Sequence, residues 1–176
     1  MRAFDGPHSS ATGRCDVPRL AFRDGFGAPT DGGPKALVVD DDYRSALAMT
    51  ALLGRANLPV IAATSAYTAL DALAEREDIG IVLMDIMMPV MDGYEAIAAI
   101  RRRSRLASMP VIAVTAKDGV GERARCMAAG ASDFIAKPID PPELLSAIGK
   151  WLPDIGRGWE QLSAGVRAAA IHVSDV

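Results

Sequence analysis

Five short runs of hydrophobic residues recur along this chain, and the segments between them repeat their apolar positions with helical spacing. The runs are apolar throughout instead of alternating, which is typical of strands buried on both faces of a parallel sheet. The predicted strands cover residues 36–40, 59–63, 79–85, 110–115 and 134–136. The predicted helices cover residues 43–56, 66–76, 94–103, 122–129 and 140–151, with Asp42 and Ser65 as caps of the first two.

Regular alternation of strand and helix predicts an α/β fold, because right-handed crossovers place helices on both faces of a parallel sheet. The expected architecture is flavodoxin-like, a doubly wound (βα)5 unit whose five-stranded sheet runs in the order 2-1-3-4-5. This domain is predicted to cover residues 35–152. Residues 1–34 are rich in Gly and Pro and are predicted to form a flexible leader. Residues 153–176 are predicted to form a tail, either a short docking helix or a frayed end.

Polar side chains stand where four of the predicted strands end. Asp40 and Asp41 close the first strand, and Asp85 closes the third. Thr115 closes the fourth strand, and Lys137 follows the fifth. In a doubly wound sheet, sites form beyond the carboxyl ends of the strands where strand order reverses, so we expect these side chains to meet. Three carboxylates, a hydroxyl and an amine suit a hard divalent cation and a phosphoryl group.

Asp85 is the predicted nucleophile of this cluster, because it ends the central strand and precedes an accessible turn. Carboxylates attack phosphorus in aspartyl-phosphate enzymes. Mg²⁺ is the expected cofactor, held by the three carboxylates and by the backbone carbonyl of Met87. Lys137 and the Thr115 hydroxyl would contact the phosphoryl oxygens, and a cis Lys137–Pro138 peptide would aim the amine inward.

Composition narrows the classes of function. The net charge is −3 and no long run of Lys and Arg occurs, which argues against binding to nucleic acid; residues 101–103 are instead predicted to end a helix. No stretch approaches the roughly 20 apolar residues that span a bilayer, so no membrane partner is expected. The two cysteines, Cys15 and Cys126, have neither disulfide-framework nor metal-ligand spacing, which favours a cytoplasmic location.

Four stretches in combination resemble the receiver domain of two-component response regulators. They are LVVDDD at 37–42, VLMDIMMPVMDGYEA at 82–96, PVIAVTA at 110–116 and AAGASDFIAKP at 128–138. The resemblance covers about residues 35–152. It implies a phosphoacceptor signalling domain of a phosphorelay. Such a domain is not an enzyme, apart from catalysing its own phosphoryl transfer and dephosphorylation. The implied partners are a histidine kinase or histidine phosphotransfer protein and a downstream protein target, and phosphorylation-dependent dimers are common in the family.

The resemblance assigns a role to each matching residue. Asp40 and Asp41 would bind Mg²⁺, and Asp85 would be phosphorylated. Lys137 would be the amine that contacts the phosphate. Phosphorylation adds negative charge and strong hydrogen-bond acceptors at one point, which gives a physical cause for a change of state nearby.

The switch residues implied by the resemblance are Thr115 and Phe134. In the family the hydroxyl moves toward the phosphoryl group and the aromatic turns inward, with a shift of the loop after strand 4 and the helix that follows. Phe134 stands where many members carry Tyr, so its inward state would depend on packing alone; it is equally readable as a core aromatic. Met87 cannot orient an attacking water, and Lys117 adds a cation at the rim. We therefore predict slow hydrolysis of the aspartyl phosphate.

Partner docking in the family uses the first helix together with the loop around residues 137–139. Tyr43, Ala46, Leu47 and Thr50 could form part of that patch, although the apolar ones could instead face the sheet. The sequence between residues 82 and 96 looks most like receivers of hybrid kinases, which exchange phosphate with histidine phosphotransfer proteins.

Three other functions compete with this prediction. A phosphate-independent interaction module would carry the same fold with a vestigial acidic pocket, but the five site residues are all present. A haloacid-dehalogenase-type phosphohydrolase needs an acid two residues after its nucleophile, where this chain has Met87. A flavodoxin-like cofactor binder would have a phosphate loop rich in Ser, Thr and Gly instead of three acids.

Overall fold

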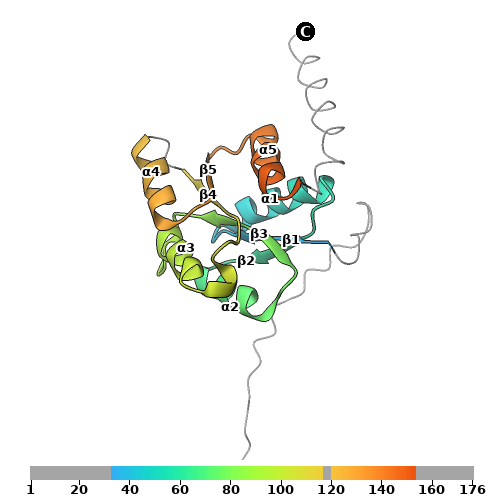
Figure 1. The fold of residues 1–176 in the computed structure, drawn as a ribbon. Coiled ribbons are helices and arrows are strands. Elements are labelled where there is room, and N and C mark those ends of the chain that lie inside the picture. Colours follow the sequence, from blue (N-terminus) through green and yellow to red (C-terminus); the bar gives the residue numbers. More distant parts are fainter. Residues whose placement is uncertain (1–32, 117–119, 154–176) are drawn as a thin grey trace, which may run out of the picture.

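The computed structural model describes residues 33–116 and 120–153 (Figure 1). Along the chain the elements are β1 (Lys35–Val39), α1 (Tyr43–Arg55), β2 (Val60–Ala63), α2 (Ala66–Glu75), β3 (Ile79–Asp85), α3 (Gly93–Arg101), a 3₁₀ turn (Ser104–Leu106), β4 (Val111–Thr115), α4 (Val120–Ala129), β5 (Asp133–Ala136) and α5 (Pro141–Trp151). The predicted leader and tail lie outside the described residues except for positions 33, 34 and 153, and they stay predictions. No helix in the described ranges is long and apolar enough to cross a membrane.

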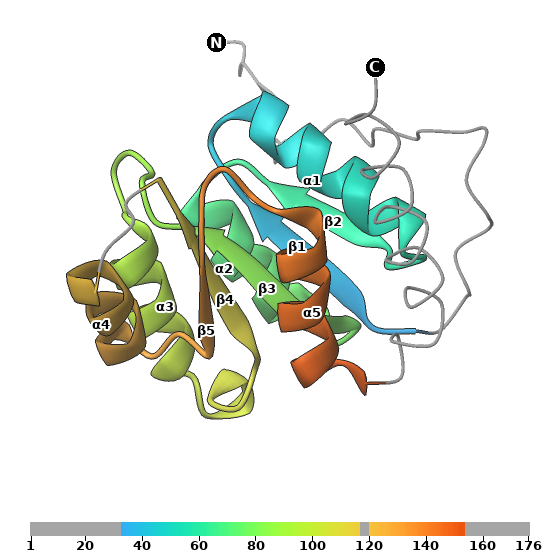
Figure 2. The ribbon, with the colours of Figure 1, turned by 90° about the horizontal axis from the view of Figure 1, so that it is seen from above.

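All five strands run parallel in one sheet of order β2-β1-β3-β4-β5 (Figure 2), so the predicted fold class and strand order are confirmed. Val39 pairs with Met84 across β1 and β3, which aligns the carboxyl ends of these two strands. Asp85 pairs with Val114 across β3 and β4. The register therefore brings the ends of β1, β3 and β4 to the same edge of the sheet.

Helices cover both faces of the sheet, and each face has its own core. Leu37 and Val39 of β1 pack with α2, α3 and α4, whereas Ala36 and Val38 pack with α1 and α5. Figure 1 shows α1 and α5 above the sheet and α2 and α3 below it. All four of these β1 residues are at most 1% exposed, which is why the strand is apolar at every position.

Helix starts follow the capping chemistry in the sequence. The Asp42 side chain accepts a hydrogen bond from the Arg44 N–H and caps α1, and Ser65 forms a capping box with Thr68 at α2, as predicted. Three predicted helix starts were wrong by one or two residues, and among them α5 begins at Pro141, directly after its N-cap Asp140. The Asp92 cap makes α3 begin at Gly93 instead of Tyr94, and α4 begins at Val120 instead of Glu122 because the helix continues through a glycine.

The predicted end of α3 at residue 103 was also wrong, because the helix ends at Arg101. Arg103 and Arg105 instead reach the carboxyl end of α2. Arg103 Nη1 donates to the Leu70 carbonyl at 2.8 Å, and Arg105 Nη2 donates to the Leu73 carbonyl. Since α2 has no basic residue in its own last turn, Arg105 supplies positive charge to a carbonyl of that turn, while Arg103 binds one turn earlier.

Candidate functional site

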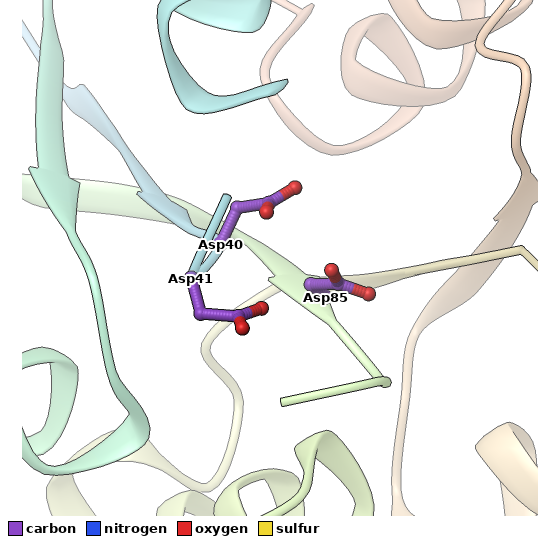
Figure 3. A group of neighbouring side chains, drawn as sticks. All are labelled: Asp40, Asp41 and Asp85. Carbon is purple, nitrogen blue, oxygen red and sulfur yellow. The ribbon is translucent and has the colours of Figure 1, made fainter. Parts of the chain in front are cut away.

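Three carboxylates meet at the carboxyl edge of the sheet. Asp40 directly follows β1, Asp41 comes next, and Asp85 is the last residue of the neighbouring strand β3. Figure 3 shows the three side chains leaving these strand ends toward one region. A ligand oxygen from each acid lies within 4.8 Å of the others. The structure thus brings together the three acids that the sequence singled out, with Asp40 and Asp85 buried and Asp41 exposed.

Lys137 reaches this cluster from the end of β5, the edge strand of the sheet. It follows β5, and its Nζ donates hydrogen bonds to Asp40 Oδ2 and Asp85 Oδ2, both at 2.9 Å. Its backbone N–H donates to the Thr115 carbonyl at 2.7 Å, which ties the residue to the end of β4. The Lys137–Pro138 peptide is cis, as predicted. One ammonium therefore bridges the two buried carboxylates.

The electrostatics of the cluster reflect burial and an excess of acid. Burial raises the pKa of Asp40, although hydrogen bonds from Lys137 and from the Asp42 N–H partly oppose the rise. For Lys137, burial acts to lower the pKa, but the hydrogen bonds with Asp40 and Asp85 outweigh it and raise the pKa. Among the described residues, Lys137 is the one cation that pairs with these three carboxylates, through Asp40 and Asp85, so this cluster retains negative charge that a divalent cation would neutralise.

The orientation of Asp85 is fixed by the turn that follows it. The Met87 N–H donates to Asp85 Oδ1 at 3.1 Å, while the Met87 side chain is 51% exposed. The Ile86 N–H donates to the Val114 carbonyl at 2.9 Å and so anchors the turn to β4. The Gly93 N–H donates to the Ile86 carbonyl at 3.0 Å, which draws the start of α3 onto the same turn.

Gly93 is a site residue that sequence reasoning missed. A Cβ at this position would lie 2.4 Å from the Asp85 carbonyl oxygen and 2.7 Å from the Ile86 Cα, closer than real Cβ atoms come. Only glycine therefore fits where α3 begins. The signal in the sequence was a glycine directly after a capping residue, Asp92, on the segment that follows Asp85.

The two predicted switch residues lie on the neighbouring strands β4 and β5, two register positions apart, and they differ in surroundings. Thr115 ends β4 and is fully buried beside the cluster. Phe134 lies on β5, is partly buried, and packs against the core formed with α2, α3 and α4. Thr115 pairs with Ala136 in the β4–β5 ladder. The predicted roles of both residues stay predictions.

The donor set of the cluster fits magnesium. Mg²⁺ takes oxygen ligands, usually one or two carboxylates together with waters and phosphate oxygens. Asp40, Asp41 and Asp85 each offer one carboxylate oxygen within 4.8 Å of the others, and of the three acids Asp41 is exposed. The Met87 backbone lies in the turn directly after Asp85, so its carbonyl is a candidate additional ligand.

Comparison with known proteins agrees with this geometry. A sequence model described as the response regulator receiver domain matches residues 36–149. The chain is 35% identical over 121 residues to Protein PilG of Pseudomonas aeruginosa, covering 69% of this chain and 89% of that protein. It is 34% identical to the Sensor protein GacS of Pseudomonas syringae, covering 77% of this chain but 15% of that protein.

Solved structures give the same result. A response regulator receiver protein from Pseudomonas putida is 30% identical, with a TM-score of 0.63 over 67% of this chain and 97% of that chain. The chemotaxis protein CheY4 of Vibrio cholerae is 26% identical, with a TM-score of 0.64 over 68% of this chain and 98% of that chain. Both similarities therefore span nearly the whole of a receiver-sized protein.

Proposed function

This chain belongs to the response regulator receiver domain family of two-component signalling, and we propose that it is a Mg²⁺-dependent phosphoacceptor in a phosphorelay. Phosphorylation of Asp85 would change the surface around β4, α4 and β5 and so control partner binding. The observation that carries the proposal is the placement of three carboxylates within 4.8 Å of one another, with Lys137 hydrogen-bonded to two of them.

In the phosphotransfer step, a carboxylate oxygen of Asp85 attacks the phosphorus of the donor. A new oxygen–phosphorus bond forms as the bond to the donor oxygen or nitrogen breaks, and the electron pair leaves with the donor. Mg²⁺, held by Asp40, Asp41, Asp85 and the Met87 carbonyl, would supply the charge neutralisation that phosphoryl transfer requires. The Met87 N–H holds one oxygen of Asp85, which limits rotation of the attacking group.

Lys137 would serve the starting state and the product in different ways. Before transfer it neutralises Asp40 and Asp85 through two bonds of 2.9 Å. After transfer its ammonium would contact a phosphoryl oxygen, and the Thr115 hydroxyl would approach another. Since Thr115 is fully buried at the end of β4, its movement would displace neighbouring packing, and Phe134 would turn into the space released.

The lifetime of the phosphorylated state should be long. The Met87 side chain is apolar and turned to solvent, so it cannot orient a water for attack on the phosphorus. Met87→Asn would place an amide two residues after the phosphoacceptor, and we expect it to speed decay of the labelled phosphoprotein. Unchanged decay in this variant would remove Met87 as the cause.

Docking of the phosphate donor is proposed on the face formed by α1 and the loop before α5. A groove of about 370 Å³ lies there, lined by Ser45, Ala48, Met49, Leu52, Lys137, Pro138, Ile139 and Pro141. Of the α1 residues predicted to dock a partner, Tyr43 and Leu47 are 55% and 45% exposed. Ala46 is buried and packs in the core, so of the two alternatives for the apolar residues it takes the one in which the side chain faces the sheet. Thr50 is partly buried and donates to the Ala46 carbonyl at 2.8 Å.

The proposed donor is a histidine kinase or histidine phosphotransfer protein, and the output is a protein target. A cytoplasmic location is part of the proposal, in line with the free thiol of Cys126. A phosphorylation-dependent dimer is a further proposal, supported by the exposed apolar side chains of Met127 on α4 and Trp151 on α5. Sedimentation with and without beryllofluoride would test it.

The test of the phosphoacceptor function is incubation with Mg²⁺ and either acetyl phosphate or beryllofluoride. We expect modification by the first and a spectral change with the second, and both should be lost in Asp85→Asn. Asp71→Asn is the matched control, because Asp71 is an exposed acid on α2. A phosphate-independent interaction module would show neither response in the unaltered protein.

A further inference from the structure

Helix α4 is held to the body of the domain differently from the other helices. Among its side chains that the structure describes, only Glu122 and Cys126 are buried, at 8% and 0% exposure. By contrast, α5 buries Leu144, Ala147 and Ile148, and α2 and α3 each bury four residues. Because apolar burial is the main force that fixes a helix in place, α4 depends unusually on polar contacts.

Those polar contacts join α4 to α3, which lies beside it (Figure 1 and Figure 2). The Tyr94 hydroxyl on α3 donates to Glu122 Oε1. The Arg125 guanidinium lies 4.5 Å from the centroid of the Tyr94 ring, and its Nη1 is 3.7 Å from Glu122 Oε2. We call this set of three residues the α3–α4 latch. It combines a hydrogen bond to a buried carboxylate, an ion pair and a cation–π contact.

The latch is placed where a change at the phosphorylation site would reach it. Tyr94 is the second residue of α3, which begins on the turn after Asp85 through the bond from Gly93 to Ile86. Glu122 lies in the first turn of α4, the helix that follows Thr115 along the chain. The latch thus connects the two segments that leave the ends of β3 and β4, where the proposed phosphoacceptor and switch hydroxyl lie.

A buried carboxylate makes the latch sensitive to small movements. The Glu122 carboxyl group is almost fully buried, so losing its hydrogen bond would leave a poorly solvated acceptor. Hydrogen bonds weaken steeply with distance and angle, whereas apolar contacts tolerate sliding. A shift of α4 driven by Thr115 would therefore break the latch, and little apolar packing would resist the shift.

We propose that the α3–α4 latch holds α4 in its resting position and thereby opposes the phosphorylated state. This inference rests on the proposed phosphoacceptor function and concerns the regulation of that same site. A contact made only in the resting state favours that state, so removing it must raise the affinity for any ligand that selects the other state. Beryllofluoride is such a ligand, because it binds a receiver as a phosphoryl mimic.

The experiment measures beryllofluoride affinity at saturating Mg²⁺ by NMR titration of the whole chain. Tyr94→Phe removes the hydroxyl and keeps the ring, and we expect affinity to rise about tenfold, the size of one hydrogen bond to a charged group. Tyr67→Phe is the matched control, the same change at a tyrosine that is 54% exposed on α2, and its affinity should equal that of the unaltered protein.

A second variant covers the case in which Tyr94→Phe does not fold. The Arg125 side chain is 62% exposed, so Arg125→Ala should leave the fold intact while removing the ion pair and the cation–π contact. We expect it to raise beryllofluoride affinity about twofold, since partly exposed contacts contribute less. Arg123→Ala is its control, because Arg123 lies on the same helix but pairs with Asp133 on β5.

The outcomes separate this inference from the proposed function. Tighter binding in both latch variants with unchanged controls supports the latch. Unchanged or weaker binding in the latch variants, with normal binding by the unaltered protein, overturns the latch and leaves the phosphoacceptor function standing. Failure of the unaltered protein to bind beryllofluoride overturns both.

Discussion

At the amino end of the sheet, Asp78 lies between two cations, with Lys35 Nζ and Arg76 Nη2 each 2.7 Å from its Oδ2. At the carboxyl end the proportion of acids to cations is reversed: among the described residues, Lys137 is the one cation that pairs with the cluster of Asp40, Asp41 and Asp85, and it does so through Asp40 and Asp85. The hydrogen bonds from Arg76 and Lys35 lower the pKa of Asp78, whereas burial raises the pKa of Asp40.

We interpret this difference as a division of roles, in which Asp78 serves the fold and the acids at the carboxyl end would hold a ligand. Asp78 is satisfied within the chain and stands at the surface, so its ion pairs contribute modestly and need nothing further. The carboxyl end is crowded with like charges, two of them buried, and repulsion among them costs stability until a cation arrives. We interpret this lost stability as a consequence of arranging the acids to bind Mg²⁺ and phosphate.

The largest effect on phosphorylation should come from adding a methyl group at a glycine near the carboxyl end of the sheet, compared with the same change at a glycine near the amino end. In Gly93→Ala the new Cβ would meet the Asp85 carbonyl at 2.4 Å, so the backbone must move by roughly 1 Å, and we expect phosphorylation by acetyl phosphate to slow about 100-fold. In Gly80→Ala the Cβ would meet the Pro34 Cβ at 2.5 Å, at the opposite end of β3 from Asp85.

Both variants should lose stability, but only Gly93→Ala should lose its phosphorylation rate per folded molecule. Urea unfolding gives the folded fraction, and the rate is measured on that fraction. Equal rates in the two variants would show that the close approach of Gly93 does not position Asp85.

The next effect is stabilisation by Mg²⁺. At a free concentration 100 times the dissociation constant, a ligand that binds only the folded state adds about 2.7 kcal/mol to the free energy of unfolding. We expect this increase in the unaltered protein and a much smaller one in Asp41→Asn at the same concentration. Asp78→Asn should keep the full increase, although its starting stability is lower. Urea unfolding with Mg²⁺ or with a chelator measures each value, and an equal increase in all three proteins would refute a site at the carboxyl end.

The smallest effect is on the pH dependence of stability without metal, where the two ends should have opposite signs. The folded-state pKa of Asp40 is raised above 3.8, so its contribution is present below pH 3.8 and is lost as pH rises through the folded value. The folded-state pKa of Asp78 is lowered, so its contribution is present above pH 3.8 and is lost as pH falls through the folded value. In urea unfolding measured against pH, the unaltered protein should lose stability above pH 3.8 because of Asp40 and below pH 3.8 because of Asp78. Asp40→Asn should abolish the first loss, and Asp78→Asn should abolish the second. The same change in both variants would contradict the comparison.

Much of this arrangement could be predicted from the sequence because it depends on strand ends. Strands that are apolar throughout predict a parallel sheet covered on both faces, and right-handed crossovers then require the strand order to reverse within the sheet. The positions of Asp40, Asp85 and Lys137 then follow, since each is tied to a strand terminus.

Contacts between helices could not be predicted in the same way. Arg103 was expected to serve the end of its own helix, yet it and Arg105 donate to carbonyls of α2, because long side chains can reach a neighbouring helix. Tyr94 and Glu122 are 28 positions apart, and no periodicity links them. Such pairs depend on how two helices pack, and that is set by the whole core.

The central claim is that Asp85 accepts phosphorus in a Mg²⁺-dependent step. It is tested most directly by incubating the protein with acetyl phosphate, reducing the acyl phosphate with borohydride, and locating the resulting homoserine by peptide mass spectrometry. The account predicts homoserine at position 85 when Mg²⁺ is present and none when Mg²⁺ is chelated. Homoserine at another acid, or none at position 85 with Mg²⁺ present, would contradict it.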